Sequence, residues 1–176
     1  MGFRVVDRLA ERAGLRLGPL GGLEAEGGAG RLAGRPVLLA KPTTFVNLCG
    51  PVLAALLRRE EAALGDALVV VDDFHLPLGL LRLRGGGGAG GHNGLSSLVE
   101  SLGTEAFPRL RLGIGSPGGA PAERYVLEPF PAGEEAAVGA AVERAADAAV
   151  AWLRDGLERA MGEVNRRELD GGEGAA

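Results

Sequence analysis

Three polar clusters in this sequence carry side chains that could do chemistry. Asn47 follows one apolar run, Asp72 and Asp73 follow a second, and His92 and Asn93 end a loop rich in glycine. Amide and imidazole groups both donate and accept hydrogen bonds, and ionised carboxylates accept them. The clusters lie far apart in the sequence, so only the fold can bring them together.

The glycine-rich loop is the most unusual stretch of the chain. It reads Gly-Gly-Gly-Gly-Ala-Gly-Gly over residues 85–91, and apolar residues at helical spacing follow it from Leu95 onward. Without a Cβ, such a backbone can adopt positive φ angles or approach another group closely. His92 and Asn93 therefore lie where a loop becomes a helix, near the free N–H groups of its first turn. That position can hold an anion or a polarised carbonyl.

Each cluster also has a purely structural explanation. Asn47 could cap a helix, and one of Asp72 and Asp73 could form a turn or a cap. No further carboxylates stand at the spacing of a magnesium site, and two histidines with one cysteine are too few for zinc. We therefore expect no metal and no cofactor.

The glycine run also satisfies the dinucleotide-binding pattern, at Gly85, Gly87 and Gly90. The pattern arises trivially in four consecutive glycines. The preceding strand is not the first of a βαβ unit, and no following strand ends in an acidic residue at the ribose-binding distance. The match is thus weak evidence. A nucleotide-binding α/β domain remains an alternative hypothesis, which titrations with NAD and ATP would test.

The remaining sequence predicts alternating helices and strands. We expect helices over 3–13, 51–59, from Leu95 onward and over 134–154, with a short helix to Asn165 after Gly156. Firm strands are expected at 36–40, 68–71, 80–84 and 110–114, and short ones around glycine turns at 23–26 and 31–32. This alternation predicts a three-layer α/β sandwich with a mixed, largely parallel sheet. Sites in such sheets lie at the carboxyl ends of the strands, so we expect the three clusters to converge there.

Composition restricts the class of protein. The 176 residues are 46% hydrophobic and 24% charged, which is typical of a soluble globular chain. We expect one domain over 1–165 and a disordered tail over 166–176. The net charge of −4 argues against a protein that coats nucleic acid but allows a local basic patch. A single cysteine, Cys49, fits a reducing cytoplasm, and no apolar run reaches membrane-spanning length.

Four motifs together resemble the bacterial-type peptidyl-tRNA hydrolases. They are Pro42-Thr43-Thr44-Phe45-Val46-Asn47-Leu48-Cys49-Gly50, Asp72-Asp73-x-x-Leu76-Pro77-x-Gly79, Arg84-x-x-Gly87-x-x-Gly90-Gly91-His92-Asn93-Gly94-Leu95 and Arg109-Leu110-Arg111-Leu112-Gly113-Ile114-Gly115. The similarity runs from Gly2 to about Arg159. It implies a cytoplasmic, monomeric enzyme without metal or cofactor. Such an enzyme cleaves the ester that joins a peptide to the 3′ ribose of tRNA, so that the tRNA can be reused in translation.

The resemblance also implies roles for individual residues. Asn47 and Asn93 would hold the peptide-ester end and the attacking water, and Phe45 would pack by the tRNA terminus. Asp72 would orient the catalytic histidine and keep it basic. These roles are chemically sound, because an amide can donate to a developing oxyanion and a carboxylate fixes the tautomer of an imidazole.

Basic residues flank the same motifs, namely Lys41, Arg82, Arg84, Arg109 and Arg111. A few such charges could bind acceptor-stem phosphates without making the whole protein basic. Each one singly could equally be part of a solvated strand edge.

The sequence departs from the family pattern at its start. In the family, the first sheet strand and a Thr-Arg-His-Asn segment with the catalytic histidine precede the residues that match Met1-Gly2-Phe3, and the 176 residues do not contain that segment. We therefore expect the recorded start to be an internal Met, and the chain as written to be weakly active or inactive and marginally stable. His92 is not the base of the family, and His75, which stands where the family usually has Asp, could replace it. A non-catalytic RNA-binding relative of the same fold is the alternative function.

Overall fold

The structure, a computed structural model, describes residues 1–119 and 121–172. The chain forms two compact units, which we describe separately. The hairpin unit comprises Val6–Val69 and Arg84–Arg109. The helical unit comprises Met1–Val5, Val70–Leu83 and Leu110–Ala176.

The hairpin unit contains an antiparallel sheet in the order β1-β2-β3. Its strands are β1 (Gly18–Pro19), β2 (Ala25–Leu32) and β3 (Arg35–Pro42). Ala33 and Gly34 connect β2 to β3 with φ angles of 49° and 77°, as a tight hairpin turn requires.

Strand β2 corrects one prediction from the sequence. Two short strands around a glycine turn were expected, but Ala25–Leu32 is continuous. A Cβ at Gly27 would collide with the carbonyl oxygen of Leu39, and one at Gly30 with the side chain of Leu15. These glycines therefore allow close packing on the strand and do not mark a turn.

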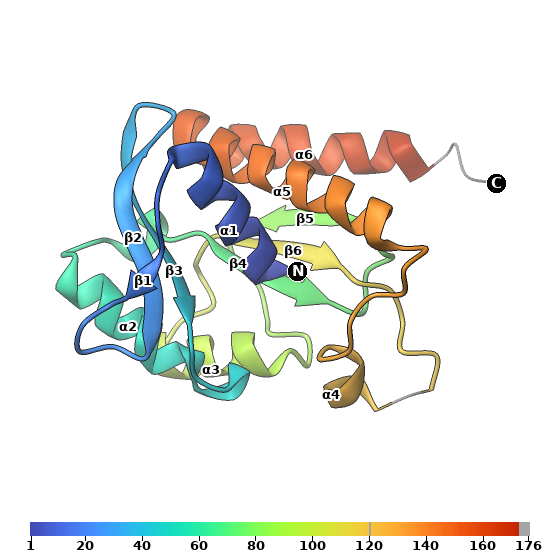
Figure 1. The fold of residues 1–176 in the computed structure, drawn as a ribbon, viewed down its shortest axis with the longest axis horizontal. Coiled ribbons are helices and arrows are strands. Elements are labelled where there is room, and N and C mark those ends of the chain that lie inside the picture. The colour runs from blue at the N-terminus through green and yellow to red at the C-terminus, as the bar shows by residue number, and fades with distance from the viewer. Residues whose placement is uncertain (120, 173–176) are drawn as a thin grey trace. The chain divides into compact units, whose positions relative to one another are not determined.

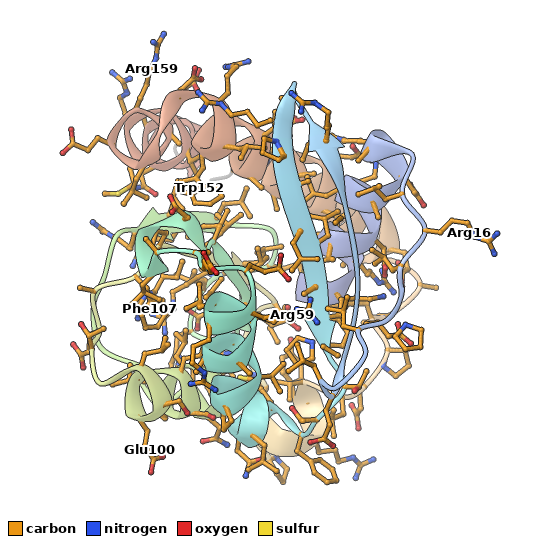
Figure 2. The ribbon with its side chains drawn as sticks, turned by 90° about the vertical axis from the view of Figure 1, so that its left-hand side faces the viewer. Arg16, Arg59, Glu100, Phe107, Trp152 and Arg159 are labelled. Atoms are coloured by element: carbon orange, nitrogen blue, oxygen red, sulfur yellow. The ribbon has the colours of Figure 1, made fainter. Side chains whose placement is uncertain are left out.

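Helix α2 (Cys49–Arg59) covers one face of this sheet. Its buried residues Val52 and Leu56 form a small core with Ala25 of β2, against which Leu38 and Ala40 of β3 also pack. The unit also contains two 3₁₀ turns, η1 (Val46–Leu48) and η2 (Leu64–Asp66), and helix α3 (Asn93–Leu102). In Figure 2, Glu100 points outward from α3, whereas Phe107, in the connection after α3, is fully buried.

The helical unit contains a second sheet, in the order β4-β6-β5. Its strands are β4 (Val69–Asp73), β5 (Leu81–Arg84) and β6 (Arg109–Gly113). In Figure 1 the arrows of β4 and β6 point the same way and that of β5 the opposite way, so this sheet is mixed. The α/β class and the mixed strand directions are therefore confirmed, while the three-layer, largely parallel arrangement is not.

The helical unit also contains two long helices, α5 (Glu135–Asp155) and α6 (Leu157–Gly172). The short helix α4 (Ala122–Tyr125) and the start of α1 (Gly2–Ala13) belong to the same unit. Helix α5 ends at Gly156, whose φ of 84° an L side chain rarely adopts. The predicted tail begins inside α6, and its last residues, 173–176, lie outside the described part of the chain. No helix among the described residues is long and apolar enough to cross a membrane.

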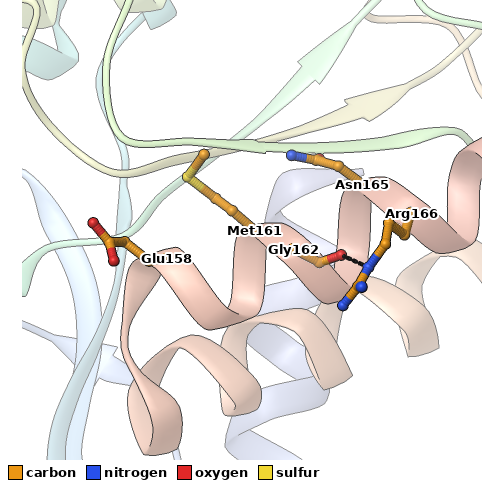
Figure 3. A pocket seen from close by; sticks show the side chains of 5 residues that line it. All are labelled: Glu158, Met161, Gly162, Asn165 and Arg166. Atoms are coloured by element: carbon orange, nitrogen blue, oxygen red, sulfur yellow. Dashed lines mark hydrogen bonds between the residues drawn. The ribbon is translucent and has the colours of Figure 1, made fainter.

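A groove runs along α6 where this helix meets strand β5 (Figure 3). It is lined by Glu158, Met161, Gly162, Asn165 and Arg166. The Asn165 amide accepts the N–H of Leu83 at 3.1 Å and donates to its carbonyl at 3.0 Å, so it satisfies the backbone of this edge strand. The Asn165 amide in this groove therefore has a structural role in holding strand β5.

Candidate active site

The segment after β3 exposes an amide between apolar side chains. Phe45, which precedes η1, is 81% exposed, and its carbonyl accepts the N–H of Leu48 at 2.9 Å. Val46 and Leu48 are also exposed, as is Asn47 between them. Among the described residues, no hydrogen-bond partner is recorded for the Asn47 side chain. The alternative role of Asn47 as a helix cap is therefore not observed, and its amide is open to a ligand.

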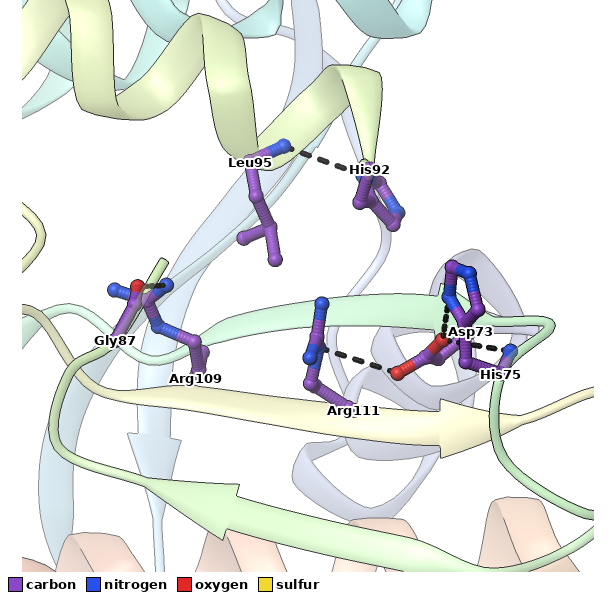
Figure 4. A network of polar contacts seen from close by, with 7 residues as sticks. All are labelled: Asp73, His75, Gly87, His92, Leu95, Arg109 and Arg111. Carbon is purple, nitrogen blue, oxygen red and sulfur yellow. Dashed lines mark hydrogen bonds and ion pairs between the residues drawn. The ribbon is translucent and has the colours of Figure 1, made fainter. Parts of the chain in front are cut away.

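The start of α3 carries the second amide. The N–H of His92 donates to the carbonyl of Ala89 at 3.1 Å, in a turn where Gly90 and Gly91 have φ angles of 59° and 79°. The Nδ1 atom of His92 then accepts the N–H of Leu95 at 3.2 Å and caps the helix (Figure 4). Asn93 is the first helical residue and is exposed beside the N–H groups of the first turn.

Close packing places these two amides on neighbouring elements. A Cβ at Gly94 would lie 2.8 Å from a methyl group of Val46, and the Cys49 thiol donates to the Gly94 carbonyl at 3.5 Å. Asn47 and Asn93 therefore lie on adjacent segments of the hairpin unit. Two of the three clusters come together, as expected from the sequence.

Gly50 sets the packing of α2 against α3 and allows a stability test. Its N–H donates to the Ser97 hydroxyl at 3.0 Å, and a Cβ at Gly50 would collide with the Ser97 carbonyl oxygen. We expect Gly50→Ala to lower the free energy of unfolding by about 1–3 kcal/mol, as overpacking does elsewhere. Urea unfolding would measure it, with Gly139→Ala in α5 as the control.

That control should behave in the opposite way. A Cβ at Gly139 meets nothing within 4 Å, and alanine is the better helix former, so stability should rise by about 0.5–1 kcal/mol. A Gly50→Ala chain as stable as the wild type would show that α2 and α3 can move apart without cost.

Asp72 lies at the end of β4, in the helical unit. Its Oδ1 accepts the N–H of Gly2 at 2.6 Å, and its Oδ2 lies 2.8 Å from the amino group of Met1. The carboxylate thus faces the first turn of α1, where negative charge is favourable. The side chain is 28% exposed, so one edge of it remains accessible.

Asp73 has a structural role. It is only 3% exposed, accepts the N–H of His75 at 2.9 Å and pairs with the Nε atom of Arg111 at 3.3 Å (Figure 4). Its carboxylate also lies 3.2 Å from the Nδ1 atom of His75. One aspartate of the pair thus forms a turn, which is the structural alternative that the sequence left open.

The basic residues differ in accessibility. Arg82 and Arg84 are exposed on β5, where Leu81 and Leu83 are buried, and among the described residues neither arginine has a recorded ion pair. Lys41 pairs with Asp7 at 2.6 Å and is 17% exposed.

Arg109 cannot serve as a phosphate contact. This expectation from the sequence is wrong, because the Arg109 side chain is 2% exposed. It donates to the carbonyl of Gly87 (Figure 4) and to the carbonyl of Glu105. The alternation of arginine and leucine in β6 (RLRLG) is typical of a strand with one exposed face. The sequence pattern therefore did not indicate that Arg109 is buried.

Comparison with known proteins identifies the family. The family model described as peptidyl-tRNA hydrolase matches residues 1–171. The chain belongs to the peptidyl-tRNA hydrolase family. It is 43% identical to the peptidyl-tRNA hydrolase of Synechococcus sp. (strain JA-3-3Ab), a match that covers 97% of this chain and 76% of that protein. It is 45% identical to the one of Nocardia farcinica, over 94% of this chain and 86% of that protein.

Solved structures give the same result. The crystal structure of peptidyl-tRNA hydrolase from Acinetobacter baumannii matches with a TM-score of 0.84 and 31% identity, over 93% of this chain and 83% of that one. A complex of peptidyl-tRNA hydrolase with n-propanol matches with a TM-score of 0.86 and 30% identity, over 93% and 84%. The α/β fold of this family is thus shown by sequence and by structure.

Within this peptidyl-tRNA hydrolase fold, Cys49 is the one thiol. Burial raises its pKa, so the group remains a protonated thiol at neutral pH and is a poor nucleophile. Cys49 is therefore not a candidate nucleophile at neutral pH.

Proposed function

We infer that this chain hydrolyses the ester bond between a peptide, or an N-blocked amino acid, and the 3′ ribose of tRNA, and so releases the tRNA for reuse in translation. Its membership of the peptidyl-tRNA hydrolase family over residues 1–171 carries this conclusion. The two exposed amides of Asn47 and Asn93 on adjacent elements support it, because ester hydrolysis needs polar groups that can reach a carbonyl and a water.

The two amides are proposed to act on the reacting carbonyl and the water. An amide N–H can donate to the carbonyl oxygen as it becomes negative, and an amide oxygen can accept a hydrogen bond from the attacking water. Asn93 also lies at the positive end of α3, which favours a developing oxyanion. The exposed ring of Phe45 is proposed to pack by the terminal base of the tRNA.

Asp72 is proposed to orient the general base. Its carboxylate faces the first residues of α1, next to the position where the resemblance puts the histidine of the family. His92 is not proposed as the base, because its Nδ1 atom accepts the N–H of Leu95 and caps α3. His75 is the alternative base within these residues, since a carboxylate at Nδ1, here that of Asp73, leaves Nε2 to accept a proton.

Phosphate contacts are proposed for Arg82 and Arg84, which are exposed on β5, with Lys41 and Arg111 as further contacts. The last two already have carboxylate partners, so their contribution to binding should be smaller. We also propose that the protein acts as a monomer in the cytoplasm.

Arg84→Ala is expected to weaken tRNA binding and to reduce the salt slope of log K by about one unit, because one phosphate contact is lost. Filter binding at several salt concentrations would measure the slope. The matched control is Arg16→Ala, since Arg16 is also exposed and extends away from the ribbon in Figure 2. Equal slopes for the two variants would remove Arg84 from the proposed binding surface.

The test of the function is hydrolysis of an N-blocked aminoacyl-tRNA by the 176-residue chain and by a version extended upstream to the next in-frame start. If only the extended version is active, the result would support the proposed function and would show that the general base lies outside the 176 residues. Activity of both would place the base within them, with His75 examined first.

An Asn47→Ala/Asn93→Ala variant, purified in parallel, controls for hydrolases from the expression host. Activity in neither version, with tRNA binding retained, would overturn the enzymatic proposal in favour of an RNA-binding role.

A further inference from the structure

Arg109 is a charged side chain buried in the hairpin unit. It is 2% exposed, and its guanidinium lies 3.9 Å from the centre of the Phe107 ring, which is itself fully buried. A buried charge is costly unless hydrogen bonds compensate it. The contacts of this guanidinium therefore explain why an arginine is tolerated here.

Those contacts join the two loops at either end of α3. One terminal nitrogen donates to the carbonyl of Gly87, in the glycine-rich loop before the helix, and the other donates to the carbonyl of Glu105, in the connection after it. The N–H of Gly87 donates to the same Glu105 carbonyl at 3.2 Å. Arg109 thus ties together the segments that enter and leave α3.

The tie lies close to the proposed catalytic amide. Two residues after Gly87, the carbonyl of Ala89 accepts the N–H of His92, and His92 caps the helix whose first residue is Asn93. A loop made almost entirely of glycine has much conformational entropy to lose. It therefore needs an external contact to hold one conformation, and Arg109 provides two hydrogen bonds for this purpose.

We propose that Arg109 is a positioning residue for the hydrolysis reaction, which holds the glycine-rich loop and, through it, the Asn93 amide in place. This inference rests on the proposed function. Arginine suits the task because its planar fork binds two carbonyls at once while its face stacks on an aromatic ring. Lysine can keep the charge but cannot form both bonds in that geometry.

Two substitutions separate the hydrogen bonds from simple packing. Arg109→Met keeps an apolar stem against Phe107 but has no donor, whereas Arg109→Lys keeps donors and charge. We expect kcat to fall by roughly 10²-fold in Arg109→Met, as small displacements of a catalytic group can cause, and less in Arg109→Lys. The KM for the N-blocked aminoacyl-tRNA should change little, because the phosphate contacts are intact.

The matched controls are Arg144→Met and Arg144→Lys. Arg144 also donates a guanidinium hydrogen bond to a glycine carbonyl, that of Gly79, but in the helical unit. These variants test the loss or replacement of a guanidinium contact outside the hairpin unit, and we expect kcat to remain at the wild-type value.

Hydrogen exchange provides a readout that does not depend on activity. Peptides covering 85–95 should exchange faster in both Arg109 variants, most in Arg109→Met, and at the wild-type rate in the Arg144 variants. Unchanged exchange over 85–95, or faster exchange with unchanged kcat, would overturn the inference. Absence of hydrolysis by both the 176-residue chain and the version extended upstream would instead contradict the proposed function, and exchange alone would then decide whether Arg109 orders this loop.

Discussion

Replacing Asn93 by alanine is expected to lower kcat for hydrolysis of an N-blocked aminoacyl-tRNA by about 10²- to 10³-fold, or about 2.7–4 kcal/mol of transition-state stabilisation. The Asn93 amide is exposed on the first turn of α3, where it can reach a developing oxyanion or a water. Interactions that form only in the transition state affect kcat more than KM. Steady-state kinetics on the active form of the chain would measure both constants.

An aspartate at the same position separates catalysis from stability. Asn93→Asp keeps the size of the side chain but can only accept hydrogen bonds when ionised. A negative charge in the first turn of a helix is favourable, so thermal stability should be unchanged or higher while kcat falls. Ser96→Ala, an exposed change on the same helix, is the control for α3. Wild-type kcat in Asn93→Asp would exclude the amide from the reaction.

Hydrophobic periodicity was sufficient to predict most elements of the fold. The structure has helices close to those expected at 3–13, 51–59 and 134–154, and strands close to 36–40, 68–71, 80–84 and 110–114. Hydrophobic periodicity could not show that the glycines of β2 lie within a strand. In sequence they indicate a turn, yet Gly27 and Gly30 lie in a strand because neighbouring groups pack directly against the backbone. Only the tertiary packing distinguishes the two cases.

The candidate site could be predicted in part, from residue type and position. Asn47 and Asn93 follow recognisable elements, and the structure places them on adjacent segments of the hairpin unit. Arg109 could not be predicted, because arginine is rarely buried and the partners of its guanidinium are backbone carbonyls, which no sequence pattern marks. The capping role of His92 had a weaker signal, its place just before the helical periodicity, but histidine is not a usual capping residue.

Replacing Asp72 by asparagine is expected to have a comparable or larger effect on the reaction. If Asp72 orients the general base, losing its charge should lower kcat by about 10²- to 10⁴-fold, the range over which positioned acid–base groups act. The isosteric amide can still accept the N–H of Gly2, so α1 should keep its place. The loss of negative charge at the start of this helix should cost about 0.3–1 kcal/mol of stability.

The matched control is Glu135→Gln, a neutralisation at the start of another helix in the same unit. Glu135 begins α5 and pairs with Arg4 at 2.9 Å, on an exposed surface. Its loss should lower stability slightly without changing kcat, since exposed ion pairs contribute little. Assays well below both melting temperatures separate activity from folding. If Asp72→Asn retained the kcat of the Glu135→Gln control, the Asp72 carboxylate would be only a cap for α1, and the base would have to be oriented by another group.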